Sequence, residues 1–424
     1  MRHHRKLLAG LLVSVILLAG GLEASADVLK PVKPEQAGFV PSRLTRIADA
    51  LKNEIEQKKM PGAVVLLARR GQVAWFETFG RLDPENAAPM PKDAIFRSYS
   101  MTKPITSVAI MMLVEEGKIV LTDPVSKFLP QLAKLSVAVE KLDPATGKIV
   151  SHTVPADREI TIQDLLRHTS GFTYGMRTTK TSVREAYRTH GIDALDITNA
   201  ELIDRIAKAP LVNHPGTAFE YGRSTDVLGR VVEVVSGMPL GRFFDERIYK
   251  PLKMTDSGFS VTADKHARIA QAFAKDVLTG QDVRMLEVTK PPKYEAGGQG
   301  GVTTAMDYAR FSQMLLNRGS LDGARLLGRH TVDLMTADHL GKMRETFTQP
   351  GYGFGLGFAV RTEQGVSAAP GSIGDYNWAG AGGTYFWIDP KEQLVAVLMA
   401  QTPGPIRVHY RTLFRDLVYQ ALGD

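Results

Sequence analysis

One serine and one lysine lie three positions apart in a setting that suits a serine nucleophile. Ser100-Met101-Thr102-Lys103 is a Ser-x-x-Lys sequence, followed by Pro104 and an apolar run to Leu113. Because proline is tolerated in the first turn of a helix, we expect a helix to begin close to Ser100. Residues three apart share a helix face, so the Lys103 amine can reach the Ser100 hydroxyl. A lysine whose pKa is lowered by poor solvation can take the serine proton.

A Ser-x-x-Lys sequence alone is weak support for catalysis. A chain of this length carries about one or two by chance, and a serine N-cap followed by a solvated lysine explains the same four residues. The present chain contains the sequence once. Any functional conclusion therefore depends on the other stretches of the chain.

Composition excludes several classes of protein. The chain has 424 residues, which is enough for a large core, and we expect it to form two lobes. It is 44% hydrophobic and 23% charged, which is ordinary for a soluble protein. Its net charge of +7 comes with no long basic run, so we expect no nucleic-acid partner. The absence of cysteine removes disulfides, cysteine-based zinc sites, a lipoprotein anchor and a thiol nucleophile.

The first 26 residues have the pattern of a signal peptide. A basic segment from Arg2 to Lys6 precedes an apolar run, and Ala24-Ser25-Ala26 forms an Ala-x-Ala cleavage site. We expect cleavage after Ala26, a periplasmic or secreted protein, and no stable membrane anchor afterwards. An uncleaved anchor is the alternative, but the apolar run is short for a spanning helix.

The order of predicted elements indicates a mixed α/β (α+β) fold. Strands are predicted at 62–68 and 72–79, joined as a hairpin, and again at 353–360, 383–389 and 394–400. Helices are predicted at 41–58 with Ser42 as N-cap, and at 161–171, 199–209, 225–236, 304–318 and 409–422. We expect an antiparallel sheet flanked by helices and built from both termini, with an inserted helical lobe. The predicted lobes are 27–117 with 291–424, and 118–290.

Three further features could belong to a site or to structure alone. Thr161 is the predicted cap and Gly171 the end of one helix, and His168 beside that end is interpreted as satisfying backbone carbonyls. Tyr221 lies in a loop before a helix, so its hydroxyl could equally face a cavity or water. The glycine-dense stretch 297–301 lacks a following Lys-Ser/Thr, which favours close backbone packing over nucleotide binding.

Taken together, these stretches resemble serine hydrolases of the β-lactamase and penicillin-binding superfamily. Among its branches the chain most resembles the family VIII carboxylesterases, whose fold is that of class C β-lactamases. The matching stretches, in order, are 100–103, 165–171, Tyr221 with 226–229, 297–310 and 378–384. The chain has no Gly-x-Ser-x-Gly, so the serine of an α/β-hydrolase is missing.

The resemblance implies roles for individual residues. Ser100 would be the nucleophile, and Lys103 and Tyr221 would act together as its bases. Which of the two takes the first proton is left open. The backbone N–H groups of Ser100 and Ala381 would form the oxyanion hole. No metal or cofactor is implied, and the partner would be a small-molecule ester or amide. Expected pocket residues are Tyr174, Arg223, Trp378, Ala379 and Gly380.

Two departures from the family pattern bear on specificity. Trp378 stands where β-lactamases have a lysine that holds a drug's carboxylate, a contact of about 1.5–3 kcal/mol. We therefore expect poor antibiotic hydrolysis and a preference for uncharged acyl groups. Arg223 replaces an asparagine, and could bind an acidic substrate group or face solvent. Gly222 and Ala379 are smaller departures that affect the shape of the pocket.

The sequence supports one main functional hypothesis and two alternatives. The main one is an exported serine hydrolase that cleaves short-chain carboxylic esters through a Ser100 acyl-enzyme. An amide hydrolase, either a β-lactamase or a D-amino-acid peptidase, would use the same residues. A non-catalytic binding protein that kept the fold is the alternative from another class.

Overall fold

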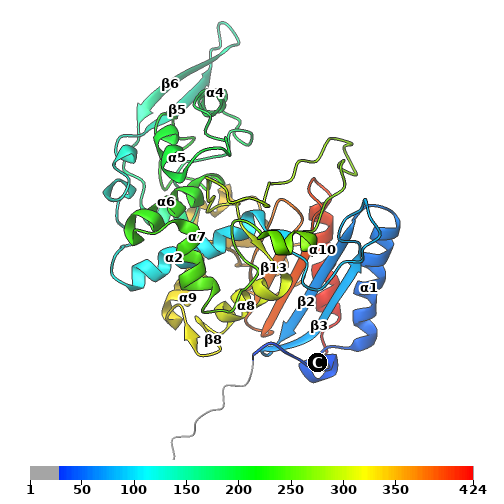
Figure 1. The fold of residues 1–424 in the computed structure, drawn as a ribbon. Helices are drawn as coiled ribbons and strands as arrows, with labels where there is room; N and C mark the ends of the chain where they lie inside the picture. Colours follow the sequence, from blue (N-terminus) through cyan, green and yellow to red (C-terminus); the bar gives the residue numbers. More distant parts are fainter. Residues whose placement is uncertain (1–27, 424) are drawn as a thin grey trace, which may run out of the picture.

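A large sheet joins the two ends of the chain in the computed structural model, which describes residues 28–423. The predicted signal peptide, residues 1–26, lies outside the described residues. The sheet has the order β1-β3-β2-β14-β13-β12-β11-β10, antiparallel except where β1 pairs with β3 (Figure 1). Its strands are β1 (Lys30–Pro31), β2 (Gly62–Arg69), β3 (Gln72–Gly80), β10 (Tyr352–Phe354), β11 (Ala359–Arg361), β12 (Tyr376–Ala379), β13 (Tyr385–Asp389) and β14 (Leu394–Ala400). The predicted sheet built from both ends of the chain is confirmed.

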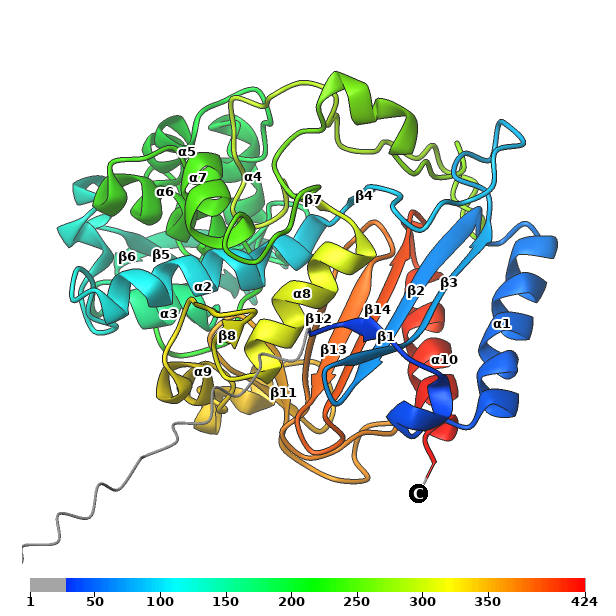
Figure 2. The ribbon, with the colours of Figure 1, turned by 60° about the horizontal axis from the view of Figure 1, so that its bottom comes forward.

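The two central strands are buried on both faces. In β2, Val64 and Leu66 belong to the core on one side of the sheet, while Val65 and Leu67 belong to the core on the other. This alternation explains why β2 and β14 read as continuous apolar runs. Helices α1 (Pro41–Glu56) and α10 (Arg407–Gln420) cover one face, and α8 (Ala305–Leu316) covers the other (Figure 2).

Helix α2 (Thr102–Glu115) lies in the middle of the molecule, between the sheet layer and a group of helices. Twelve of its fourteen residues are buried, which explains an apolar sequence on every side of the helix. It packs against α6 (Ser224–Ser236), and the Tyr308 hydroxyl of α8 donates to the Met101 carbonyl at 2.9 Å. The turn before α2 is thereby fixed from both sides.

The remaining elements form the helical part of the molecule and short strand pairs. The helices are α3 (Ile162–Leu166), α4 (Thr181–Thr189), α5 (Asn199–Ile206), α7 (Leu240–Phe244) and α9 (Arg329–Met335). The strand pairs are β4 (Phe96–Arg97) with β7 (Val302–Thr303), β5 (Ser136–Leu142) with β6 (Ile149–Pro155), and β8 (Ser320–Leu321) with β9 (Ala324–Arg325). Hairpin β5–β6 projects far from the large sheet (Figure 1). Among the described residues no helix is both long and apolar enough to cross a membrane. The limits of the two lobes stay predictions.

Three predicted element boundaries are wrong. Val40, not Ser42, is the N-cap of α1, because Pro41 already occupies the first helical position. The predicted strand 353–360 is two short strands, β10 and β11, because Gly357 turns the chain with a φ of 109°. The Thr161 cap of α3 is confirmed, but that helix ends at Leu166, well before Gly171.

Candidate active site

Ser100 lies in a short 3-10 turn, Tyr99–Met101, that leads directly into α2. Its neighbour Tyr99 has a φ of 46°, a left-handed conformation that costs about 1–3 kcal/mol for a bulky residue. The Tyr99 hydroxyl accepts a hydrogen bond from the Leu286 N–H at 3.3 Å. The Tyr99 ring packs so closely on Gly382 that a Cβ added to this glycine would lie 2.6 Å from the ring. The surrounding chain thus holds the turn, and with it the position of Ser100.

The glycine-dense stretch braces the same turn. The backbone N–H and the hydroxyl of Ser98 both lie 2.8 Å from the Gly301 carbonyl, and the Gly301 N–H donates to Thr102 Oγ1 at 2.9 Å. A Cβ on Gly301 would lie 2.8 Å from both hydroxyl oxygens. The predicted close backbone packing of residues 297–301 is confirmed.

Two side chains converge on the Ser100 hydroxyl. Tyr221 Oη donates to Ser100 Oγ at 2.8 Å, and Lys103 Nζ lies 3.4 Å from the same oxygen. Lys103 is only 1% exposed, and its Nζ also donates to the Gly298 carbonyl at 2.7 Å and to Tyr174 Oη at 3.1 Å. These three acceptors match the three N–H donors of an ammonium group. We infer that Lys103 carries a positive charge in the resting site.

The electrostatics of Lys103 agree with this inference. Burial by itself lowers the pKa of the amine, but attraction to Tyr174, Tyr221 and Asp226 outweighs it, and the net shift of the Lys103 pKa is upward. The condition named from the sequence for Lys103 to act as a base, a pKa lowered by poor solvation, is therefore not met in the resting site. Burial also raises the pKa of Tyr174 to about 12, so this phenol is neutral at neutral pH.

The Tyr221 ring is held by other aromatic rings. Its centre lies 5.4 Å from that of Trp378, 5.8 Å from that of Tyr174 and 4.8 Å from that of His168. Such contacts fix a ring without hydrogen-bonding its hydroxyl. The sequence left open whether the Tyr221 hydroxyl faces a cavity or water. The structure supports the cavity, because Tyr221 lines it together with Ser100.

His168 supports the site without capping a helix. The side chain is 1% exposed, its Nδ1 has no hydrogen-bond partner within residues 28–423, and its Nε2 lies 3.5 Å from Thr225 Oγ1. Burial and the nearby Lys103 charge hold the pKa of His168 well below its usual value, so the ring is neutral. The interpretation that it satisfies backbone carbonyls is wrong, because the ring turns inward against Tyr221.

Arg223 belongs to the support of the site, and neither sequence interpretation of it is correct. The side chain is 2% exposed, donates to Asp193 at 2.7 Å and lies 3.8 Å from Asp226. Its guanidinium also lies 5.0 Å from the centre of the Tyr174 ring. It contacts neither solvent nor the Ser100 cavity, since two carboxylates hold it in the interior.

A cavity of about 600 Å³ opens in front of Ser100. Of the expected pocket residues, Trp378 and Ala379 line it, and so does the predicted oxyanion-hole residue Ala381. Tyr174, Gly380 and Arg223 do not. A Cβ on Gly380 would approach the Ser98 carbonyl within 2.4 Å, so the end of β12 lies directly against the Ser100 turn.

The walls of this cavity differ in chemistry. One part is aromatic, with Phe219, Tyr221, Phe347 and Trp378, and another part carries arginine side chains. Sequence reasoning found Tyr221 and Trp378 but missed Phe219, Phe347 and the arginines. No periodic pattern marks the missed residues, because they come from segments that are distant in the sequence.

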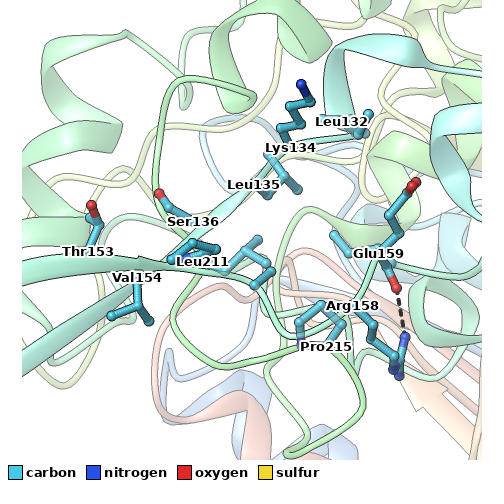
Figure 3. A pocket seen from close by; sticks show the side chains of 14 residues that line it. Leu132, Lys134, Leu135, Ser136, Thr153, Val154, Arg158, Glu159, Leu211 and Pro215 are labelled. Atoms are coloured by element: carbon cyan, nitrogen blue, oxygen red, sulfur yellow. Dashed lines mark hydrogen bonds between the residues drawn. The ribbon is translucent and has the colours of Figure 1, made fainter.

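A second cavity, of about 550 Å³, lies beneath hairpin β5–β6 (Figure 3). Its wall includes Leu135, Val154 and Leu211, and its Arg158 donates to the Glu159 carbonyl at 2.8 Å and pairs with Asp164. The serine in its wall, Ser136, has no side-chain hydrogen bond to a base within residues 28–423. Within residues 28–423 no group of three or more acidic or histidine side chains could hold a metal ion. The Ser100 cavity is therefore the candidate active site.

Comparison with known proteins agrees with this geometry. The sequence model of the beta-lactamase family matches residues 47–420. The chain belongs to the beta-lactamase family. Protein Rv1367c of Mycobacterium tuberculosis is 37% identical over 353 residues, which cover 81% of this chain and 86% of that protein. Esterase EstB of Burkholderia gladioli is 30% identical over 413 residues, which cover 90% of this chain and 96% of EstB.

A solved structure extends the likeness to the fold. EstCE1, described as a hydrolase with promiscuous acyltransferase activity, superposes with a TM-score of 0.74 at 28% identity. The match covers 89% of this chain and 98% of EstCE1. The resemblance to the β-lactamase and penicillin-binding superfamily is thus confirmed, and this beta-lactamase family member is a serine hydrolase.

Proposed function

We propose that this protein is an exported carboxylesterase that cleaves short-chain esters through an acyl-enzyme on Ser100. The observation that carries the proposal is the convergence of two side chains on one hydroxyl: Tyr221 Oη at 2.8 Å and Lys103 Nζ at 3.4 Å from Ser100 Oγ. The names of EstB, an esterase, and EstCE1, a hydrolase, support ester cleavage. The signal-peptide pattern of residues 1–26 supports export.

The reaction follows from where each group lies. After the Lys103–Tyr221 pair has lost one proton, it accepts the proton of Ser100 while Ser100 Oγ attacks the ester carbonyl carbon. The oxyanion that forms accepts hydrogen bonds from the backbone N–H groups of Ser100 and Ala381. The C–O bond to the alcohol then breaks, and the pair returns the proton to the departing oxygen. A water molecule activated by the same pair hydrolyses the acyl-enzyme.

The proposal is tested on the mature protein with a short p-nitrophenyl ester. Ser100→Ala should lose more than about a thousandfold in kcat, because the nucleophile is removed. Ser151→Ala, at an exposed position on β6, is the matched control and should keep the activity. Undiminished turnover by Ser100→Ala contradicts the proposal. If a fluorophosphonate leaves Ser100 unlabelled, the fold is being used for binding instead.

Acyl transfer to an alcohol is a second candidate function. It is favoured by the similarity to EstCE1, a hydrolase with promiscuous acyltransferase activity, and by a cavity of about 600 Å³ beside Ser100. An alcohol in place of water would attack the same acyl-enzyme. Adding a short alcohol and separating the products should then yield a new ester at the expense of free acid, whereas free acid alone indicates a strict hydrolase.

A further inference from the structure

The cavity in front of Ser100 carries positive charge that nothing in its wall balances. Four arginines line it, and no Asp or Glu does so within residues 28–423. One of them, Arg415, forms a 2.5 Å ion pair with Asp375, a carboxylate that also pairs with Arg361. The other three, Arg177, Arg407 and Arg411, form no ion pair with any described carboxylate. A group of like charges that line one cavity is unfavourable unless a ligand neutralises it.

These three arginines influence one another. Burial and then the charge of Arg177 lower the pKa of Arg407, with Asp276 opposing the shift. Burial and then the charge of Arg407 lower the pKa of Arg411 to about 10. The guanidinium of Arg177 also lies 5.4 Å from the centre of the Tyr221 ring. The positive region therefore extends from the proposed base to helix α10.

The same wall contains hydrogen-bond donors without acceptors. Trp378 Nε1, Asn377 Nδ2 and Arg411 Nε are buried and have no partner within residues 28–423. Tryptophan and arginine side chains can only donate, and buried donors are nearly always paired in native proteins. These donors favour a group that accepts hydrogen bonds, and the arginines of the same wall favour one that carries negative charge.

Arg411 connects this wall to the proposed oxyanion hole. Its Nη2 donates to the Gly380 carbonyl at 2.5 Å, one residue before Ala381, and this bond fixes the guanidinium at the end of β12. An arginine has five N–H donors in a fixed fork that suits the two oxygens of a carboxylate. The aromatic part of the cavity, where the Phe219 and Phe347 ring centres lie 4.7 Å apart, offers a surface for an apolar group.

We propose that the substrate of this site carries a carboxylate, which Arg177, Arg407 and Arg411 bind while an apolar part of the substrate packs against Phe219, Phe347 and Trp378. The inference rests on the proposed function and names its substrate class: esters with one free carboxylate. It reverses the expectation, drawn from Trp378 alone, that uncharged substrates are preferred. The cation absent at position 378 is supplied from α10 and from the loop before α4.

The test compares acids with their own methyl esters. On the acyl side, mono-p-nitrophenyl glutarate is paired with its methyl ester, and on the alcohol side 4-butanoyloxybenzoate is paired with its methyl ester. For one of the two pairs, kcat/KM of the acid should exceed that of the methyl ester by about tenfold or more. This ratio should fall as salt is added, because the attraction is partly screened.

Variants assign the preference to the arginines. Arg177→Gln and Arg407→Gln should each reduce the acid-to-methyl-ester ratio by about tenfold, and Arg407→Lys should keep part of it because the charge remains. Arg329→Gln, exposed on α9 and outside the cavity, is the control that should keep the wild-type ratio. Unfolding curves in urea verify that each variant is folded, and Arg177, which is exposed, provides a variant that folding should tolerate.

The outcomes separate the two proposals. If Ser100-dependent cleavage of the neutral esters is present but neither pair shows a ratio above one, the carboxylate inference is overturned and the proposed function stands. If the ratio is high and unchanged in both glutamine variants, the assignment to these arginines is overturned. Cleavage that persists in Ser100→Ala contradicts the proposed function itself.

Discussion

The Lys103 amine lies closer to the Gly298 carbonyl, at 2.7 Å, than to the Ser100 hydroxyl, at 3.4 Å. The backbone of the glycine-dense stretch 297–301 therefore fixes the Lys103 ammonium group, which makes only a longer contact with Ser100. The Gly298 N–H in turn donates to Asp226 at 3.1 Å, so the carbonyl is itself held by α6. This chain of contacts orients the charge that Tyr221 faces, since Lys103 Nζ lies 4.6 Å from the centre of the Tyr221 ring.

The raised pKa of Lys103 predicts an alkaline pH dependence. The reactive form has lost one proton from the Lys103–Tyr221 pair, and the net upward shift of the Lys103 pKa means that this proton leaves above neutral pH. We expect kcat/KM to rise by up to about tenfold per pH unit from roughly pH 6 to pH 9, measured against the uncatalysed rate. Lys103→Met should lose about a hundredfold or more in kcat/KM.

A flat profile above about pH 7 would contradict this account, because it would place the essential ionisation near the ordinary range of a histidine. Tyr221→Phe is the companion variant. It removes the only oxygen that donates to Ser100 Oγ within the described residues and should reduce kcat by about a hundredfold or more.

The parts of this molecule that the sequence predicts well are those marked by periodicity or by local turn chemistry. Strand β14 has the predicted bounds, because seven consecutive apolar residues are buried on both faces. The start of α2 was predictable from Pro104, which cannot stand deeper in a helix. Strands β10 and β11 are three residues each, too short for a pattern to separate them.

The site was predictable only in its central residues. Ser100, Lys103 and Tyr221 stand in recognisable stretches, whereas the Gly298 carbonyl lies 195 positions from Lys103 and presents a backbone atom that no residue type reveals. Arg223 looked like an exposed cation because its partner Asp193 lies 30 positions away, in an irregular segment. Contacts between distant segments are set by tertiary packing, which a single sequence does not display.

Gly222 is predicted to be irreplaceable beside Tyr221. A Cβ at this position would lie 2.3 Å from the Thr173 Cα, a backbone atom that cannot give way locally. Gly222→Ala should therefore displace the Tyr221 loop, lower kcat by about a hundredfold and destabilise the fold by about 1–3 kcal/mol. Steady-state kinetics and urea unfolding measure the two effects.

Gly258→Ala is the matched control for Gly222→Ala. The nearest atom to a Cβ at Gly258 is the Ser260 carbonyl oxygen at 3.4 Å, an ordinary contact. This variant should retain both activity and stability. Equal effects of the two substitutions would show that the close approach of Gly222 to Thr173 is not what positions Tyr221.

Asp164 is predicted to make the fold sensitive to acid. Burial raises the pKa of this carboxyl, but hydrogen bonds from Arg158 and Thr161 outweigh it and lower the pKa to about 2. A folded-state pKa below the unfolded value of about 3.9 contributes about 2 kcal/mol of stability above that value, which is lost as the pH falls toward 2. In Asp164→Asn, the free energy of unfolding should lack this pH-dependent contribution.

Urea unfolding at neutral pH and in the range of about pH 2–4 measures the effect. The difference in the free energy of unfolding between wild type and Asp164→Asn should shrink as the pH falls. Asp49→Asn, at an exposed carboxylate of α1, should follow the wild-type curve at every pH. A constant difference across the range would mean that the ion pairs of Asp164 add no net stability through its ionisation.

His168 is predicted to act on Tyr221 through packing and not through proton transfer. Its neutral ring lies 4.8 Å from Tyr221 and 5.6 Å from Phe354, centre to centre, and no atom of it is hydrogen-bonded to Ser100. His168→Ala should cost about 2–4 kcal/mol of stability and lower kcat with little change in KM, because Tyr221 loses a neighbour. His168→Phe, which restores a ring, should recover much of both. If proton transfer were its role, the phenylalanine variant would be as inactive as the alanine variant, and the pH profile of kcat/KM would change shape in both.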